Sequence, residues 1–316
     1  MHTDWGERTA RWAGIRSETV SVDDTEVHVL RAAAAPDAPA DAPTQLLVHG
    51  LGGSSSNWLE VLSALTAHGP VLAPDLPGFG RTQPPRPSAA RTGVNARFLR
   101  RLLAHEGLDR VVVHGNSMGG LLSVLLADLA PDRVERLVLV DPALPAPVRS
   151  VGRIPARTLA RFAPFLVPPL GKALLGYSWR RFDGATLYEQ TAEFLHADTS
   201  RLSPEITALG AEHLDWGRDQ PWRLDGFTTA ATSVVTAMTV GQRSLGQAIA
   251  RVQAPTLVVW GDQDRLVGRH VIDHLADRRP DWEVQVLPGV GHVPMLEVPG
   301  TYLEVVGDWF GGGLTR

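Results

Sequence analysis

Short apolar runs recur along the chain and are separated by stretches with helical periodicity. Six runs have the length and the continuous apolar character of buried parallel strands; they cover residues 45–48, 71–73, 111–113, 134–140, 256–260 and 284–287. Helical patterns lie between most of them, over residues 97–103, 118–129, 270–277 and 302–310. Strands that alternate with helices predict an α/β fold with a mainly parallel, doubly wound sheet.

Two regions depart from this alternation. Residues 18–31 alternate between apolar and polar positions around a central turn, which predicts an antiparallel pair of strands. Between residues 143 and 250 the sequence is helical and punctuated by proline, and a segment of roughly a hundred residues is too long for a structureless loop. We therefore expect a core domain of residues 1–143 and 251–316 with an inserted helical cap over residues 144–250.

Gly115-Asn116-Ser117-Met118-Gly119 has the pattern Gly-x-Ser-x-Gly between a predicted strand and a predicted helix. A turn this sharp strains its central residue and leaves no room for side chains two positions away, which favours glycine at both flanks. The turn also exposes the central hydroxyl in front of the helix N-terminus. The motif predicts that Ser117 is a nucleophile; a glycine-rich turn with an incidental serine is the alternative.

Five motifs in order extend this observation along the chain. They are His49-Gly50-Leu51-Gly52-Gly53, Pro74-Asp75-Leu76-Pro77-Gly78-Phe79-Gly80, Gly115-Asn116-Ser117-Met118-Gly119-Gly120, Trp260-Gly261-Asp262-Gln263-Asp264 and Gly289-Val290-Gly291-His292. Together they resemble the α/β-hydrolase superfamily over about residues 44–143 and 252–311. The resemblance implies the α/β-hydrolase fold. Serine at position 117 argues against epoxide hydrolases and haloalkane dehalogenases, which need a carboxylate nucleophile.

A serine hydroxyl needs a base, and in this family the acid and the histidine follow the serine in that order. Three histidines lie beyond the predicted cap. His270 and His274 are four residues apart on a predicted helix, where a solvent-exposed face explains them. His292 follows the last predicted strand in a glycine-rich loop, so we expect it to be the base.

Three aspartates follow strands where the acid could lie. The family pattern Gly-x-x-Asp places it at Asp264, three residues after Gly261, and makes Asp262 a turn residue. Asp141 follows the strand over residues 134–140, where a few related enzymes keep their acid, so it remains an alternative.

The resemblance also implies an oxyanion hole made of two backbone N–H groups, which belong to Leu51 and Met118. His49 and Asp75 have the side chains of catalytic residues, but we expect both to support loops.

An apolar stripe in the predicted cap has two interpretations. Leu159, Phe162, Leu166 and Leu170 recur at intervals of three and four, so they either pack on the core domain or line an apolar pocket. Our expected substrate contacts are Gly50, Asn116, Phe162, Leu166 and Val293. The sequence does not rank five further candidates in the cap, which are Trp179, His196, His213, Trp216 and Trp222.

Composition excludes several classes of protein. The formal net charge is −4, so nothing favours nucleic acid as a partner. There is no cysteine, which excludes disulfides, zinc–thiolate sites and a cysteine nucleophile. The first residues lack the features of a signal peptide, and no run approaches the ~18 apolar residues of a membrane span. We expect a cytoplasmic protein that acts on a small molecule without a cofactor or metal.

The most general function left is hydrolysis of a carboxylic ester of a small to medium apolar substrate, through an acyl-enzyme on Ser117. The elbow is also similar to that of hydrolases that cleave carbon–carbon bonds in ring-fission products, although those favour an oxyanion loop containing Gly-Pro-Gly. Carbon–carbon, thioester or lactone cleavage and acyl transfer therefore remain alternatives on the same triad. A catalytically silent ligand-binding protein is the alternative of another class.

Overall fold

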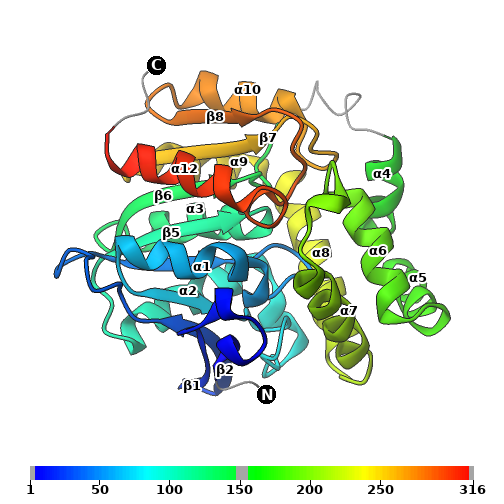
Figure 1. Ribbon diagram of the computed structural model, residues 1–316. Helices are drawn as coiled ribbons and strands as arrows, with labels where there is room; N and C mark the ends of the chain where they lie inside the picture. The colour runs from blue at the N-terminus through cyan, green and yellow to red at the C-terminus, as the bar shows by residue number, and fades with distance from the viewer. Residues whose placement is uncertain (1–3, 147–155, 313–316) are drawn as a thin grey trace.

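An eight-stranded sheet forms the centre of the computed structural model, which describes residues 4–146 and 156–312 (Figure 1). Its strands are β1 (Arg16–Val22), β2 (Thr25–Ala32), β3 (Thr44–Val48), β4 (Val71–Pro74), β5 (Val111–Asn116), β6 (Val134–Val140), β7 (Thr256–Gly261) and β8 (Glu283–Leu287). They lie in the order β1-β2-β4-β3-β5-β6-β7-β8. β2 is antiparallel to β1 and to β4, and all the other neighbours are parallel. The predicted fold class is confirmed.

Helices cover both faces of the sheet. One face carries α2 (Thr92–His105), α3 (Met118–Leu129), α9 (Gln242–Arg251) and α10 (Arg269–Arg278), and the other carries α1 (Leu59–Leu65), α11 (Pro294–Glu297) and α12 (Pro299–Phe310). Successive strand residues point to opposite faces, so in β5 Val111 and Val113 join the first core cluster and Val112 joins the second. Burial on both faces explains why the central strands are continuous apolar runs.

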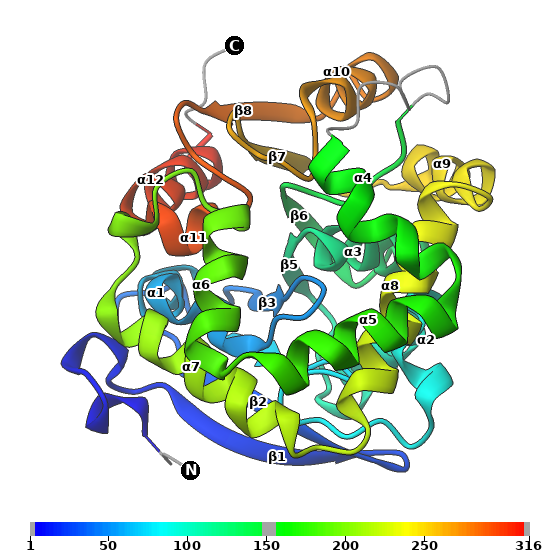
Figure 2. The same ribbon diagram turned by 90° about the vertical axis from the view of Figure 1, so that its right-hand side faces the viewer.

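The cap consists of helices inserted between β6 and β7. They are α4 (Ala156–Phe162), α5 (Pro168–Arg181), α6 (Gly184–Leu195), α7 (Pro204–Arg218) and α8 (Arg223–Met238). They lie at the right of Figure 1, and in the turned view of Figure 2 they are in front of the sheet. α9 lies within the expected cap boundaries but packs on α3 of the core. We therefore propose that the cap ends after α8.

Within the described residues, no helix combines the length and the apolar character needed to cross a membrane.

Candidate active site

Ser117 is the residue between β5 and α3, and its backbone has the strained angles φ 55° and ψ −115°. Holding a non-glycine residue in such a conformation costs about 1–3 kcal/mol. The flanking glycines make the turn possible. A Cβ on Gly119 would collide with the carbonyl oxygen of Val48, and a Cβ on Gly115 would collide with Ser123 Oγ. The local sequence therefore fixes the turn that presents the hydroxyl.

His292 lies in the loop after β8 and is held beside this turn. Its Nδ1 donates to Asp264 Oδ2 at 2.7 Å, which leaves Nε2 as the basic atom of the ring. Its carbonyl oxygen accepts from the Asn116 side-chain amide at 3.0 Å, and Asn116 immediately precedes Ser117. Its backbone N–H donates to the Leu195 carbonyl at 2.6 Å, so the cap also fixes the histidine.

Asp264 follows β7, and its two carboxylate oxygens have different partners. Oδ2 accepts from His292, and Oδ1 accepts from the backbone N–H of Leu266 at 2.7 Å. Asp262 has the turn role expected of it, because its Oδ1 accepts from the N–H of Gly289 at 2.7 Å. Of the three candidate acids, the structure brings Asp264 to the histidine.

Asp141, the alternative acid, lies next to Asp264. Its Oδ1 accepts from the N–H of Gly261 at 3.0 Å. Its Oδ2 is buried, and no donor of the described residues reaches it. Donor atoms of Asp141, Asp264 and His292 all lie within 4.8 Å of one another. Burial and the charge of Asp264 raise the pKa of Asp141 well above its ordinary value. A proton on Asp141 lets Oδ2 donate toward Asp264.

The same three side chains have the spacing of metal ligands, as no other His/Asp/Glu group does in the described part of the chain. A metal would need a lone pair from His292 Nδ1, but that atom donates its proton to Asp264. The geometry fits a hydrogen-bonded triad better than an ion site.

The proposed oxyanion hole lies across from the hydroxyl. Gly50 packs against the turn, since a Cβ there would lie 3.2 Å from Ser117 Cβ, and Leu51 follows Gly50. Met118 is the first residue of α3. Among the described residues, neither Leu51 nor Met118 has a backbone acceptor for its N–H, so both groups are available to an oxyanion.

His49 and Asp75 support the oxyanion loop, as expected. His49 Nδ1 donates to the Gly50 carbonyl at 2.8 Å, and Nε2 accepts from the N–H of Leu76 at 3.1 Å. Burial lowers the pKa of His49, so the ring is neutral and both nitrogens are used structurally. Asp75 accepts from the N–H groups of Ser55 at 2.7 Å and Arg81 at 2.8 Å. Burial opposes the charge of Asp75, but its hydrogen bond with His28 helps to lower the pKa overall.

Comparison with known proteins agrees with this geometry. The family model for the alpha/beta hydrolase fold matches residues 43–299. The chain belongs to this family.

Two relatives and one solved structure show the range of activities among similar hydrolases. The chain is 28% identical over 300 residues to a 2-hydroxy-6-oxononadienedioate/2-hydroxy-6-oxononatrienedioate hydrolase of Cupriavidus pinatubonensis, covering 94% of this chain and 95% of that protein. It is 28% identical over 265 residues to Lipase 1 of Psychrobacter immobilis, covering 80% and 72%. The 2-hydroxy-6-oxo-6-phenylhexa-2,4-dienoate hydrolase of Rhodococcus sp. strain RHA1 has the same fold, with a TM-score of 0.74 and 23% identity, covering 94% of this chain and 99% of that chain.

Glu297 is a residue of this hydrolase that our sequence reasoning missed. It is 2% exposed, and its carboxylate accepts from the N–H groups of Gly291 at 2.9 Å, Ala197 at 3.1 Å and Asp198 at 3.1 Å. Burial opposes its charge, but the nearby His196 and the hydrogen bonds from these backbone groups lower its pKa overall. Glu297 therefore joins the cap segment after α6 to the loop that carries His292. No local pattern in the sequence singles out Glu297.

Two expected substrate contacts have other roles. The Asn116 amide donates to the carbonyl oxygens of Val140 at 3.2 Å and His292 at 3.0 Å, so it fixes the histidine rather than facing a ligand. Val293 is 3% exposed and belongs to the core cluster that contains α11 and α12. The Asn116 side chain is thus held by hydrogen bonds, and the Val293 side chain is packed in the core.

The apolar stripe of the cap does not lie on one inner face. Leu166 is 60% exposed and Leu170 is 48% exposed, so neither the core-packing nor the pocket-lining expectation describes them. The reason is a change of helix type: α4 ends at Phe162, which is half-buried, and a 3-10 helix with a different angular step follows. The side chain of Leu159 is outside the described residues.

Phe165 points inward in place of these residues. Its ring packs on Phe227 of α8 with centroids 5.7 Å apart, and Phe227 in turn contacts the oxyanion loop, where a Cβ on Gly52 would lie 2.9 Å from its ring. The aromatic pair thus connects the cap to the loop that carries Leu51. No pattern in the sequence singles out Phe227.

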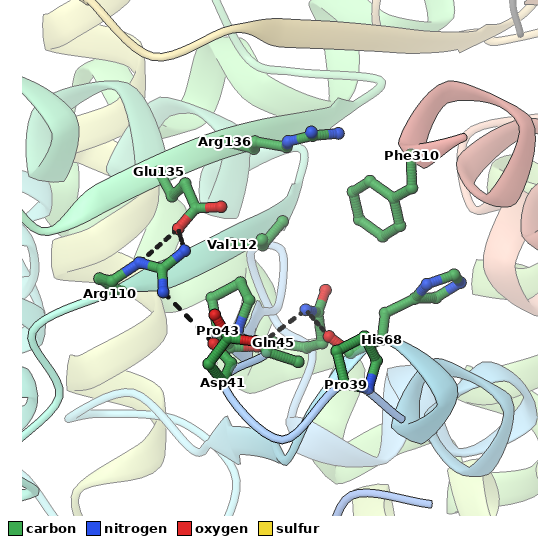
Figure 3. A pocket seen from close by; sticks show the side chains of 11 residues that line it. Pro39, Asp41, Pro43, Gln45, His68, Arg110, Val112, Glu135, Arg136 and Phe310 are labelled. Carbon is green, nitrogen blue, oxygen red and sulfur yellow. Dashed lines mark hydrogen bonds and ion pairs between the residues drawn. The ribbon is translucent and has the colours of Figure 1, made fainter. Parts of the chain in front are cut away.

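A hollow of about 270 Å³ lies elsewhere, as Figure 3 shows. Val112, Glu135 and Arg136 line it from the amino ends of β5 and β6, whereas the triad follows the carboxyl ends of the strands. Two of its lining residues, Arg110 and Glu135, form an ion pair with each other. It is therefore not part of the candidate active site.

Proposed function

We propose that this protein is a serine hydrolase that cleaves a carboxylic ester of a small to medium apolar substrate through an acyl-enzyme on Ser117. The observation that carries the proposal is the 2.7 Å hydrogen bond from His292 Nδ1 to Asp264, in a loop tied to the strained turn of Ser117. A hydroxyl alone is a weak nucleophile, and this arrangement supplies the oriented base that activates it.

The chemistry follows from the positions of these groups. Ser117 Oγ attacks the ester carbonyl while His292 Nε2 takes its proton, and Asp264 stabilises the imidazolium that forms. The N–H groups of Leu51 and Met118 donate to the oxyanion of the tetrahedral intermediate. His292 then gives the proton to the leaving alcohol, and water releases the acid from the acyl-enzyme by the same steps.

The apolar character of the substrate is supported by the residues around the oxyanion loop. Leu51 is half-buried on that loop, Met118 is buried beneath it, and Phe227 approaches it from the cap. Apolar and aromatic walls with a few polar groups are the usual lining of a small-molecule site.

Carbon–carbon hydrolysis is the second candidate, and Arg223 favours it together with the Cupriavidus relative. Arg223 is 5% exposed, and its Nη1 has no hydrogen-bond partner among the described residues. Burial lowers its pKa to about 10, against the opposing effect of Asp75. Arg223 is one helical turn before Phe227 on α8. A dienedioate, the substrate class in that relative's name, would supply a carboxylate to this unpaired guanidinium.

Two measurements test the proposal in sequence. A fluorophosphonate probe should label the wild-type protein and not the Ser117→Ala variant, because only an activated serine reacts; absence of labelling would indicate a silent ligand-binding protein. A panel of p-nitrophenyl esters, thioesters and a dienedioate ring-fission product then separates the reactions. We expect the highest kcat/KM on the esters. A dienedioate preference that Arg223→Met removes would favour the second candidate instead.

A further inference from the structure

Exposed apolar side chains gather on helix α5 of the cap and on the two residues before it. Seven large apolar residues of the described part of the chain are exposed, and five of them fall within residues 166–177. We call these five the α5 face: Leu166 (60% exposed), Val167 (55%), Leu170 (48%), Leu174 (49%) and Tyr177 (60%). Scattered apolar residues are normal on a protein surface, but a contiguous group usually marks an interaction site.

The geometry of α5 makes this face continuous. Leu170, Leu174 and Tyr177 recur at intervals of four and three, so they lie on one side of the helix. The opposite side packs inward through glycines: Gly171 lies against Phe165, and Gly176 lies against Leu224 of α8. Figures 1 and 2 both show α5 on the outer side of the cap, away from the sheet. The helix is therefore packed on one side and uncovered on the other.

The charge around this face is one-sided. Residues 156–182 contain five basic residues and no acidic one, although the whole chain has a net charge of −4. Lys172 forms an ion pair with Asp225 of α8, whereas the exposed Arg180 and Arg181 lie at the end of the apolar stripe. An apolar stripe bordered by arginine and tyrosine has the composition of a helix that lies in a lipid–water interface.

We propose that the α5 face docks on an anionic phospholipid surface, with the leucines and Tyr177 in the headgroup region and Arg180 and Arg181 against lipid phosphates. A second copy of the chain is a weaker match. In a two-fold contact the same face meets itself, and residues 156–182 contain no acidic residue that could pair with the arginines of the other copy. A bilayer with anionic headgroups satisfies the apolar stripe and the positive charge together.

The test is co-sedimentation with vesicles of phosphatidylglycerol and phosphatidylcholine in equal amounts, compared with vesicles of phosphatidylcholine alone. Wild-type protein should bind the mixed vesicles and bind the neutral ones more weakly. Leu170→Ser/Leu174→Ser should lower binding to both by at least about tenfold, because it removes apolar area. Arg180→Gln/Arg181→Gln should remove the preference for the mixed vesicles and its dependence on salt.

Val240→Ser is the matched control, because Val240 is 88% exposed and is not part of the α5 face. It should bind like the wild type. Thermal melting followed by circular dichroism checks the fold of every variant, so the test does not depend on the proposed catalytic activity.

Three results would overturn the proposal: no binding of the wild type to mixed vesicles at low salt, equal binding by the leucine variant, or an equal loss in Val240→Ser. Concentration-dependent dimerisation that disappears in the leucine variant, without vesicle binding, would assign the face to a second copy instead.

Discussion

Helix α3 of the core and helix α5 of the cap have similar lengths but bury very different shares of their residues. α3 buries nine of its 12 residues, whereas α5 buries two of 14, and both of those are glycines. α3 begins directly after Ser117, the proposed nucleophile, and lies against the sheet, so most of its side chains are buried in the core. α5 contacts mainly α8 and the short helix before it. The helix behind the proposed nucleophile is therefore held by packing in the core, while the cap helix α5 is attached through few buried residues.

Several hydrogen bonds attach the cap to the core. The Thr158 hydroxyl donates to the carbonyl of Arg265, Ser233 accepts from the N–H of Thr92 at 3.1 Å, and Glu297 binds the segment after α6. We therefore expect substitutions in the core site to abolish chemistry and substitutions in the cap to change stability and substrate choice.

The largest effect should come from the core. Ser117→Ala removes one oxygen from the turn and should lower kcat by about 10⁶, as loss of the nucleophile does in comparable serine hydrolases. The melting temperature should stay close to that of the wild type. Ser178→Ala on α5 is the control and should keep full activity. A Ser117→Ala variant with more than a few per cent of the wild-type kcat would contradict the assignment.

Asp264→Asn should lower kcat by about 10⁴, because the amide cannot hold the imidazole in the tautomer that has a basic Nε2. Asp141→Asn should lower it less than about tenfold, since an amide still donates toward Asp264 and asparagine tolerates the φ of 44°. Steady-state kinetics on one ester compares the two. If the larger loss of kcat occurred in Asp141→Asn, the catalytic acid would be Asp141, which follows β6, instead of Asp264, which follows β7.

Glu297 joins the loop of His292 in the core to the cap segment after α6. Glu297→Ala leaves the N–H groups of Gly291, Ala197 and Asp198 without their acceptor, at about 1–3 kcal/mol for each one that stays buried. Melting experiments should show a clear loss of stability, together with a lower kcat because the loop of His292 loosens. Glu304→Ala on the exposed side of α12 is the matched control. Equal melting temperatures of the two variants would show that Glu297 does not hold the cap to the loop of His292.

The same contrast between core and cap decides how much the sequence could predict. The strand over residues 134–140 and the helix over residues 118–129 were predicted with the observed bounds, because both are mostly apolar and most of their residues are buried in the core. In the site, the motifs predicted Ser117, Asp264 and His292, which the structure brings to one edge of the sheet.

Contacts between residues far apart in the sequence were much harder to predict. Glu297 and Phe227 act through contacts with segments far away in sequence, which no local pattern encodes. The stripe of the cap misled us because a regular 3.6-residue period does not continue through the 3-10 helix Ala163–Leu166, where Pro164 interrupts the α-helical register.

A smaller effect concerns pH and the carboxyl pair of the core. The pKa of Asp141 is raised in the folded protein, so folding keeps a proton that the unfolded chain loses above about pH 4. The stability this proton allows is fully present below pH 4 and is lost as pH rises toward the folded pKa. In that pH range the free energy of unfolding of the wild type should therefore fall relative to that of Asp141→Asn, by up to about 1.4 kcal/mol per pH unit. Denaturant unfolding at several pH values measures it, and parallel curves would show that Asp141 is ionised.

The smallest expected effect tests which part of the cap meets the substrate. Each methylene buried in the transition state contributes ~0.8 kcal/mol, or nearly fourfold in kcat/KM, so activity on p-nitrophenyl esters should climb with acyl length until the site is full. Phe227 lies against the oxyanion loop, whereas Phe162 is the half-buried last residue of α4. Phe227→Ala should therefore flatten the climb, with little change for acetate, and Phe162→Ala should leave its slope intact. If Phe162→Ala flattened the climb and Phe227→Ala did not, the acyl chain would bind at the stripe. If the wild type and both variants were most active on acetate, the acyl chain would not contact the cap.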